Sequence, residues 1–471
     1  MKKTFFSILI FTLCTFTILS PLSVAATENS TPSSGEFMEE LNCESALLIH
    51  LDSGTVLYEK DPAREVEPVF LTKLMIALLT LETVDNQTLP ADAEERDASI
   101  EKALNSIPVT APDYIFDELN RLGSSQPNIK RDETLSVLQL LNLLLVPSGN
   151  DAAMVLAHHL SGGNIPAFVD KMNARAKELG AVNTFFTNVH GFHDPEQITT
   201  VYDIYRITKP LLAKNTFMKI VEQVVYRLEP TNQSDKVRSY RTTNLMMDNN
   251  TGSGYYYRPV KGIKTGRNDD SGFCVATYAI RDNTPYFCVV MGAPAHDSKG
   301  NLINTNGAFK DTKALCSWAF SNFETKSIIK KGDSVAQVTL KYAWNQDALV
   351  LNAASDFDAL LPKSVNPKSI LLIPDVPEVL EAPVAEGDVI GTVDIMYAGK
   401  KIGTINVVAS LSAEKNTMQV VSDLVDAVLE SIWLYVGLGV LALGLGIYMG
   451  VFFLSNRKNK GKVSRQRNRR Y

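Results

Sequence analysis

A single lysine lies inside an apolar, helix-like run near the start of the chain. Residues 67–82 read EPVFLTKLMIALLTLE, and Lys73 is the only charged residue between the two terminal glutamates. Lysine is rarely buried without a function, because its ammonium group must leave water. In a dry cleft beside other cations its pKa falls, and it can then take a proton from a hydroxyl. The position one turn earlier would carry that hydroxyl, but it is occupied by Phe70.

Two more short motifs follow, PSGN at 147–150 and GIKTG at 262–266. Each is weak alone, since Ser, Gly and Asn favour plain turns and K-T-G arises by chance. Here K-T-G precedes an apolar segment that reads as a strand. An S-x-x-K helix followed by S-x-N and then K-T-G is the signature of penicillin-recognising serine acyl-transferases. The first element falls at 70–73, where this chain reads F-L-T-K.

Taken together and in this order, the motifs are specific, and the sequence resembles the D-alanyl-D-alanine carboxypeptidases. These are low-molecular-mass penicillin-binding proteins that trim peptidoglycan stem peptides. The resemblance extends over almost the whole segment between the two apolar ends of the chain. It is carried by SALLIHLDSGTVLYEKD, LLLVPSGNDAAMVLAHHLSG, TFFTNVHGFHDPEQITTVYDI, VKGIKTG and, in the second half, EAPVAEGDVIGTV.

The resemblance implies a role for each motif residue and implies no cofactor or metal. Lys73 would be the base, and Ser148 would relay a proton towards the leaving amine. Asn150 would hold the substrate amide. Backbone N–H groups would form the oxyanion hole. In the last motif, Lys264 would supply positive potential. Thr265 and Gly266 would contact the substrate.

The chain departs from the family pattern at the nucleophile. Phe70 has no hydroxyl, and in another serine hydrolase losing the nucleophile lowers turnover on the order of 10⁶-fold. Thr72 is no simple substitute, because it points roughly 200° around the helix from position 70. Arg267 and Asn268 follow K-T-G, and no arginine lies in the loop after the last strand to hold a substrate carboxylate. Arg267 or Lys299 would have to replace it.

Three functions stay open at this point. The first is a family member that acts on or binds stem peptides ending in D-Ala-D-Ala and has lost or impaired activity, with β-lactams or active relatives as further partners. The second is a working serine-type carboxypeptidase in cell-wall remodelling, which requires that Phe70 is a sequence error or that Thr72 or Ser148 is the nucleophile. The third is a non-catalytic, membrane-anchored adaptor.

The order of apolar patterns predicts an α+β fold. A hairpin around DSG comes first, followed by helical segments and then two strands, GFCVATYAI and PYFCVVMGA. The resemblance implies a transpeptidase domain like that of β-lactamases and penicillin-binding proteins, followed by a small all-β domain. The expected segments are a signal peptide at 1–25, the carboxypeptidase-like domain at 41–324, the β domain at 326–410, a connecting helix at 414–429, a transmembrane helix at 432–454 and a basic tail at 455–471.

The two ends of the chain predict export and anchoring. Two lysines, a short apolar run and the small residues SVAA are typical of a secretory signal. Near the other end, 23 uncharged residues precede eight Lys or Arg, which predicts a single membrane pass with a cytoplasmic tail. The segment between them would face the cell wall. It carries a net charge of about −16, which argues against nucleic-acid binding.

Cysteine and histidine positions give no support for a metal site. The cysteines after the signal lack zinc-ligand spacing, and Cys274 and Cys288 are expected to be buried small side chains. His190 and His193 flank Gly191 in a loop. We expect His190 to hold local hydrogen bonds there rather than to bind a metal.

Overall fold

The computed structural model describes residues 37, 39–85, 93–124 and 129–466. The predicted signal peptide lies outside the described residues. The chain divides into two compact units, Met1–Trp318 and Ala319–Tyr471.

The first unit is built on a five-stranded antiparallel sheet in the order β2-β1-β9-β8-β7. The predicted opening hairpin is confirmed, because β1 pairs with β2 across the DSG turn. The two later apolar segments are confirmed as neighbours, β8 and β9. The sheet therefore joins both ends of this part of the sequence. Its strands are β1 (Ser45–His50), β2 (Val56–Lys60), β7 (Val260–Asn268), β8 (Gly272–Arg281) and β9 (Thr284–Ala293).

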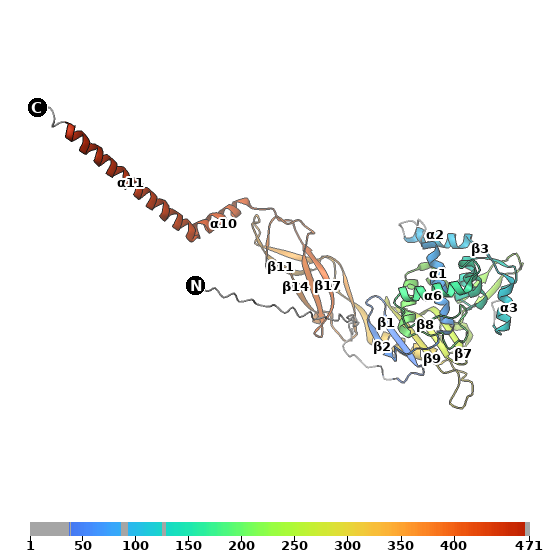
Figure 1. The fold of residues 1–471 in the computed structure, drawn as a ribbon. Coiled ribbons are helices and arrows are strands. Elements are labelled where there is room, and N and C mark those ends of the chain that lie inside the picture. Colours follow the sequence, from blue (N-terminus) through green and yellow to red (C-terminus); the bar gives the residue numbers. More distant parts are fainter. Residues whose placement is uncertain (1–36, 38, 86–92, 125–128, 467–471) are drawn as a thin grey trace, which may run out of the picture. The chain divides into compact units, whose positions relative to one another are not determined.

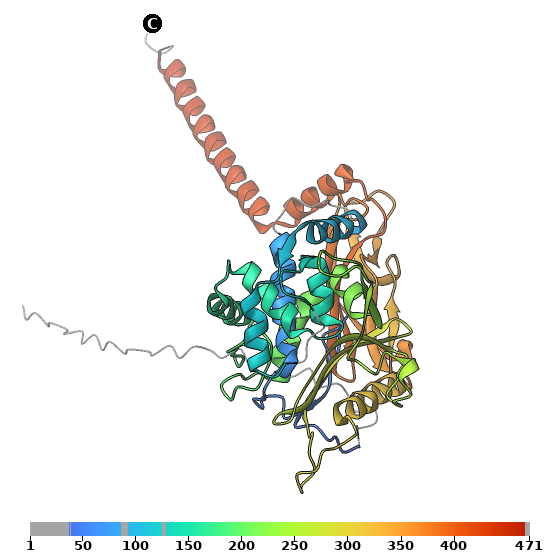
Figure 2. The same ribbon diagram turned by 90° about the vertical axis from the view of Figure 1, so that its right-hand side faces the viewer.

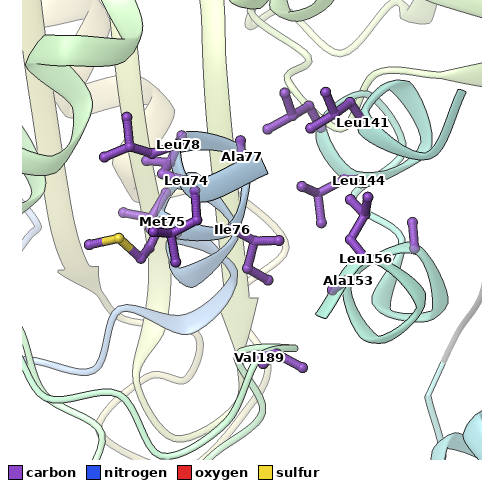
Figure 3. Packing of buried hydrophobic residues seen from close by; sticks show 14 of the residues in the cluster. Leu74, Met75, Ile76, Ala77, Leu78, Leu141, Leu144, Ala153, Leu156 and Val189 are labelled. Carbon is purple, nitrogen blue, oxygen red and sulfur yellow. The ribbon is translucent and has the colours of Figure 1, made fainter. Parts of the chain in front are cut away.

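Helices cover one face of this sheet (Figure 1). Figure 3 shows Ile76 of α1 facing Leu144 of α4 and Leu156 of α5, and all three belong to one buried apolar cluster. Burial of these long aliphatic chains stabilises the helical layer around α1. The helices of this unit are α1 (Lys73–Asp85), α2 (Ala93–Ser106), α3 (Asp113–Arg121), α4 (Val137–Leu145), α5 (Asn150–Leu160), α6 (Ile165–Glu178), α7 (Val201–Leu212) and α8 (Asn215–Val221).

Strand β9 is buried on both faces, which explains its continuous apolar sequence. Phe287 and Val289 face the helical cluster. Cys288, on the opposite face of the strand, interacts with Cys316 of α9 (Gly307–Asn322). Figure 2 shows α9 and α1 on opposite sides of the strands. The expectation of buried, unpaired cysteines is confirmed for Cys274 and Cys288, both of which are free thiols.

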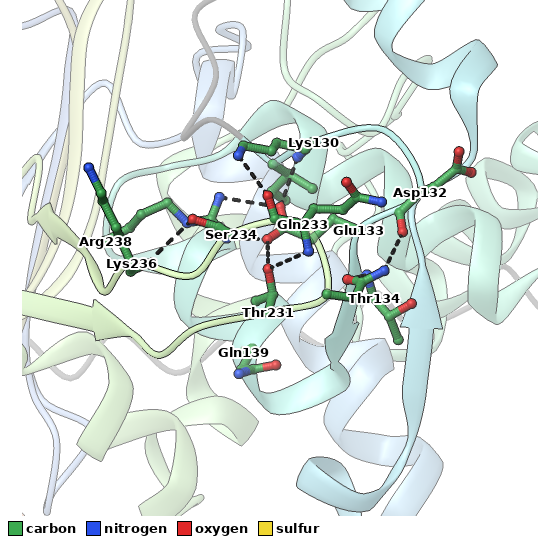
Figure 4. Close-up of polar contacts among 12 residues, drawn as sticks. Lys130, Asp132, Glu133, Thr134, Gln139, Thr231, Gln233, Ser234, Lys236 and Arg238 are labelled. Atoms are coloured by element: carbon green, nitrogen blue, oxygen red, sulfur yellow. Dashed lines mark hydrogen bonds and ion pairs between the residues drawn. The ribbon is translucent and has the colours of Figure 1, made fainter.

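Two short two-stranded sheets border the helical layer and are tied together by a buried ion pair (Figure 4). They are β3 (Pro108–Thr110) with β4 (Thr134–Ser136), and β5 (Val225–Leu228) with β6 (Arg238–Arg241). Glu133, just before β4, is fully buried and pairs with Arg238 at the start of β6. Its carboxylate also accepts hydrogen bonds from Thr231 Oγ1 and from the backbone N–H of Lys130 (2.8 Å).

The second unit begins with a small β domain around its own apolar cluster. A six-stranded sheet in the order β14-β16-β17-β12-β11-β15 accompanies a two-stranded sheet of β10 and β13 (Figure 1). The strands are β10 (Phe323–Ile329), β11 (Ser334–Lys341), β12 (Ala348–Ala353), β13 (Phe357–Pro362), β14 (Leu371–Asp375), β15 (Val379–Glu381), β16 (Val389–Tyr397) and β17 (Lys400–Ala409). The predicted α+β fold with a second all-β domain is confirmed.

Two helices follow the β domain, α10 (Thr417–Glu430) and α11 (Ile432–Gln466). Within Ile432–Asn456 of α11, an 18-residue stretch has a mean hydropathy of 2.1. By length and composition, this is the one helix among the described residues that is suited to crossing a membrane.

The main helix begins later than the apolar pattern suggests. Helical periodicity starts at Leu71, but residues Val69–Thr72 form a 3₁₀ turn and α1 starts at Lys73. Likewise the apolar run LSVLQLLNLLLV begins at Leu135, but α4 starts at Val137. The two residues before Ser136 pair with β3, and the Ser136 side chain caps the helix. Local periodicity cannot separate a 3₁₀ turn or a short paired strand from the helix that follows it.

Candidate active site

Phe70 stands in the 3₁₀ turn that leads into α1. In such a turn, side chains at i and i+3 eclipse each other, so position 70 lies directly beside Lys73. The Lys73 Nζ atom is 4.1 Å from the centroid of the Phe70 ring. The half-buried Phe70 ring also meets Phe192 edge to face, with 6.3 Å between the ring centroids. A phenyl ring therefore contacts the lysine where acyl transfer would need a hydroxyl.

The turn before Phe70 is held in an unusual backbone conformation by close neighbours. Val69 has φ +48°, which a β-branched residue rarely adopts and which costs roughly 1–3 kcal/mol. A Cβ atom on Gly191 would lie 2.1 Å from the Val69 carbonyl oxygen, and one on Gly266 would lie 3.0 Å from the Phe70 nitrogen. Glycine at these two positions lets the K-T-G strand and the 188–193 loop approach the turn.

Lys73 is fully buried and its amine binds two oxygens. Its Nζ donates to Asn150 Oδ1 at 2.7 Å and to the His190 carbonyl oxygen at 3.1 Å. Burial, reinforced by the charge of Lys264, holds the pKa of Lys73 well below its usual value, while Asp151 opposes this shift. A lysine in this environment has the character of a base.

The start of α5 supplies the S-x-N motif. Asn150 is buried, and its amide is oriented at both ends, because Oδ1 faces Lys73 and Nδ2 donates to Ser124 Oγ at 2.6 Å. Ser148 has φ +64°, and its hydroxyl is buried without a hydrogen-bond partner among the described residues. Burial raises the pKa of Asp151 to about 7, against hydrogen bonds from backbone N–H groups.

Strand β7 supplies the K-T-G motif. Lys264 is 1% exposed and its Nζ donates to the Thr265 carbonyl oxygen at 2.7 Å. The Thr265 hydroxyl shares a 2.6 Å hydrogen bond with the hydroxyl of Thr243. Burial lowers the pKa of Lys264 from 10.5 to about 7. The strand thus places a second buried amine close enough to Lys73 to depress its pKa.

The lowered pKa of Lys264 makes the stability of the folded chain depend on pH. Because its pKa in the folded chain is about 7, below the ordinary 10.5, the unfolded chain binds the additional proton between these values. Lys264 therefore makes the free energy of unfolding rise with pH across this window. We expect the free energy of unfolding of the natural chain, minus that of a Lys264→Met variant, to increase from pH 7 to pH 10 in denaturant titrations. The exposed Lys261 on the same strand is the control.

A constant difference between the natural chain and Lys264→Met over this pH range would contradict the depressed pKa of Lys264. The Lys261→Met variant separates the effect of the buried amine from that of removing one positive charge. It should show no comparable growth of the difference with pH.

The carboxylate of Glu67 ties three segments around the site. It pairs with His193 Nδ1 at 2.6 Å and accepts hydrogen bonds from Asn268 Nδ2 at 3.1 Å and Ser271 Oγ at 2.5 Å. Asn268 anchors the turn after K-T-G to the segment before Phe70. The sequence alone contained no signal for this cluster, whose members are up to 204 residues apart.

Thr72 is a candidate substitute for the missing serine, and Arg267 or Lys299 for the missing arginine. Each of them forms other contacts. The buried Thr72 hydroxyl donates to the Val69 carbonyl oxygen at 2.9 Å, within its own turn. The Arg267 guanidinium lies 5.0 Å from the centroid of the Phe273 ring and 3.8 Å from Asp269. Lys299 donates its backbone N–H to Asp297 Oδ1 at 2.8 Å.

The two loop histidines both serve local structure. The His190 Nδ1 accepts a hydrogen bond from the Phe192 backbone N–H at 3.2 Å, as expected for a histidine that orders its loop. Burial and the charge of Lys73 lower the pKa of His190 to about 4. Among the described residues, no group of His, Cys, Asp and Glu is arranged to hold a metal ion.

The structure brings the predicted residues of all three motifs into one region. Lys73 and Asn150 touch, Phe70 lies over Lys73, and Lys264 acts electrostatically on Lys73. Sequence reasoning missed the Ser124 contact to Asn150. The polar stretch GSSQPN around that serine is a turn signal, but nothing in it indicated which side chain the hydroxyl would meet.

Penicillin-binding proteins are among the solved structures with a similar fold. Penicillin-binding protein 5 from Haemophilus influenzae matches with a TM-score of 0.59 and 24% identity, over 81% of this chain and all of that one. A peptidoglycan synthesis regulatory factor (PBP3) from Streptococcus pneumoniae matches with a TM-score of 0.59 and 22% identity, over 80% of this chain and all of that one. The fold is thus that of a penicillin-binding protein with a C-terminal β domain.

Sequence comparison then identifies the family. The family model for D-alanyl-D-alanine carboxypeptidase matches residues 28–295, and that for the C-terminal domain of penicillin-binding protein 5 matches 323–415. The D-alanyl-D-alanine carboxypeptidase DacF of Bacillus subtilis is 26% identical over 79% of this chain and 86% of its own length. DacA of Haemophilus influenzae is 26% identical over 84% and 90%. The chain belongs to the D-alanyl-D-alanine carboxypeptidase family.

Proposed function

We propose that this chain binds peptidoglycan stem peptides ending in D-Ala-D-Ala and does not cleave them at a useful rate. The observation that carries the proposal is the Phe70 ring, 4.1 Å from the amine of Lys73. In the proposed site, Lys73 is a base without a nucleophile, because a phenyl ring can neither lose a proton nor attack a carbonyl. Asn150 and Lys264 remain to hold the substrate amide and carboxylate, together with Thr265.

The contacts of the alternative hydroxyls favour this proposal over a working enzyme. The Thr72 hydroxyl is buried and donates within its own turn, so it is not presented to a substrate. The hydroxyl of Ser148 is also buried, and that residue belongs to a different motif, where its proposed task is proton relay. Neither group stands at the position that Phe70 occupies beside Lys73.

The proposal includes a location. The apolar part of α11 would cross the membrane once, with the basic tail in the cytoplasm and both folded domains on the cell-wall side. A signal peptide at 1–25 would direct the export. β-Lactams would enter the same site without forming the acyl link, and active relatives are candidate partners in the same membrane.

The experiment uses the full-length chain in a non-ionic detergent and a diacetylated L-Lys-D-Ala-D-Ala tripeptide. We expect no release of D-alanine above that of a Lys73→Met variant, and saturable binding by calorimetry. Asn150→Ala or Lys264→Met should weaken this binding by about tenfold or more, since each removes a polar contact to the bound peptide. The exposed Lys261→Met variant serves as the control for fold and charge.

The results separate the three functions. Rapid D-alanine release by the natural chain would overturn the proposal and establish a working carboxypeptidase. If the chain neither releases D-alanine nor binds the tripeptide, the proposal fails and the non-catalytic adaptor is the function that remains. Binding without release, lost on substitution of Asn150 or Lys264, would support the proposal.

A further inference from the structure

A second cleft lies in the first unit. It shares His190 with the surroundings of Lys73. It has a volume of about 640 Å³ and lies between α3, the α5–α6 turn, α6 and the 185–190 segment. Its lining includes none of Phe70, Lys73, Asn150 or Lys264. A cleft of this size is in the range that holds drug-sized ligands.

The cleft is lined by apolar and aromatic groups that remain exposed. Tyr114 is 41% exposed and Phe185 is 48% exposed, although both are large and largely apolar. Ile165, Pro166 and Val169 of α6 continue this lining. Aromatic rings that face a hollow offer large contact areas at small entropic cost, which is the character of a binding surface.

Hydrogen bonds hold the walls of the cleft in place. Asn173 of α6 binds both the backbone N–H (2.7 Å) and the carbonyl oxygen (2.8 Å) of Phe186, which fastens α6 to the opposite wall. The Tyr114 hydroxyl shares a 2.8 Å hydrogen bond with His158 Nδ1. Gly163, at φ +97°, lets the α5–α6 turn pass His158, because a Cβ there would lie 3.3 Å from the imidazole. The cleft is therefore formed before any ligand arrives.

Three carboxylates line the cleft without partners. Glu118 comes from α3, Asp170 from α6 and Glu196 from the loop before α7. None of these three carboxylate groups accepts a side-chain or backbone hydrogen bond, or forms an ion pair, with a residue that the structure describes. No lysine or arginine is found among the described residues that line the cleft. Because the charges come from three separate elements, a ligand with more than one positive group complements them best.

We propose that this cleft binds a peptide segment in which an apolar side chain is flanked by lysine or arginine side chains. The apolar side chain would pack on Tyr114, Phe185 and α6, and the cations would meet the rim carboxylates. This segment would belong to a protein partner on the same side of the membrane. The negative charge of the region before the membrane helix, about −16, would add long-range attraction. The proposal does not depend on the function proposed for the other site.

The test uses fluorescently labelled acetyl-Lys-Leu-Lys-Leu-Lys-amide and the full-length chain in non-ionic detergent. We expect saturable binding by fluorescence anisotropy that weakens as salt is added. A variant with E118Q, D170N and E196Q should bind about tenfold more weakly or worse, and Phe185→Ser should have a similar effect. The D-Ala-D-Ala tripeptide should not displace the probe.

A matched control removes three other exposed carboxylates of the same unit, with E65Q, E222Q and D282N. It should bind the probe within about twofold of the natural chain, because it leaves the cleft intact. If both triple variants lose the same amount of peptide affinity, the binding reflects general charge attraction and the proposal is overturned. Equally tight binding of acetyl-Lys-Ser-Lys-Ser-Lys-amide would also overturn it, since the apolar lining would then contribute nothing.

Discussion

Phe70→Ser is expected to turn a chain that a fluorescent penicillin does not label into one that it acylates. The substitution places a hydroxyl one turn before Lys73, whose amine is buried, has a depressed pKa and is held by Asn150 and the His190 carbonyl. In a serine protease, removal of the nucleophile lowers turnover on the order of 10⁶-fold. Restoring it should raise the acylation rate by at least about a thousandfold, because the phenyl ring also leaves the site. The measurement is covalent labelling of the full-length protein over time.

The matched control is Phe70→Ala, which empties the same space without adding a hydroxyl. Labelling of Phe70→Ser but not of Phe70→Ala would assign the gain to the nucleophile rather than to an opened cleft. Adding Lys73→Met to Phe70→Ser should abolish the gain, since no base would then remain. If the natural chain is labelled, a substitute nucleophile exists. If Phe70→Ser is not labelled, more than the serine has been lost, and the Val69 turn and the turn held by Glu67 are the next segments to compare with relatives.

Glu133→Ala is expected to destabilise the first unit by about 3–5 kcal/mol, the range for breaking one side of a buried ion pair. Glu133 is fully buried, and its carboxylate accepts hydrogen bonds from Arg238, Thr231 and the Lys130 N–H (Figure 4). Burial alone would raise the pKa of Glu133, but these donors outweigh it and hold the pKa below 4.5. The variant removes the carboxylate that pairs with the Arg238 guanidinium, whose side chain is only 12% exposed.

The measurement is the free energy of unfolding in urea at pH 7, taken from the transition of the first unit. The matched control is the double variant with E133L and R238M, which replaces both charges by apolar groups of similar length. It should lose much less than Glu133→Ala, because no unpaired charge remains. A Glu133→Ala loss below about 1 kcal/mol would mean that Arg238 finds water or another acceptor, and would contradict the structural role of the pair.

The same network connects to the candidate active site. The segment from Ile129 to Glu133 ends at the ion pair, and the Ile129 N–H donates to Asp151 at 3.3 Å, beside Asn150. Loosening Glu133 is therefore expected to weaken tripeptide binding as well as stability. Nothing in the local sequence predicted this link, because Glu133 and Arg238 are 105 residues apart.

The sequence by itself determined the order of the three motifs, the opening hairpin, the apolar strands, the family and the absence of a hydroxyl at position 70. These follow from local patterns, since strand alternation, helical spacing and motif spacing are properties of short segments. The burial of Lys73 was also predictable, because one charge in an apolar helix must be satisfied by the fold around it.

Only the tertiary structure decided what each of these residues touches. It placed the Phe70 ring over the Lys73 amine, because the chain enters α1 through a 3₁₀ turn that local periodicity does not separate from the helix. It oriented the Asn150 amide between Lys73 and Ser124, and it gathered the contacts of Glu67. Such contacts join residues far apart in the chain, and they exist only once the sheet, helices and loops have packed together.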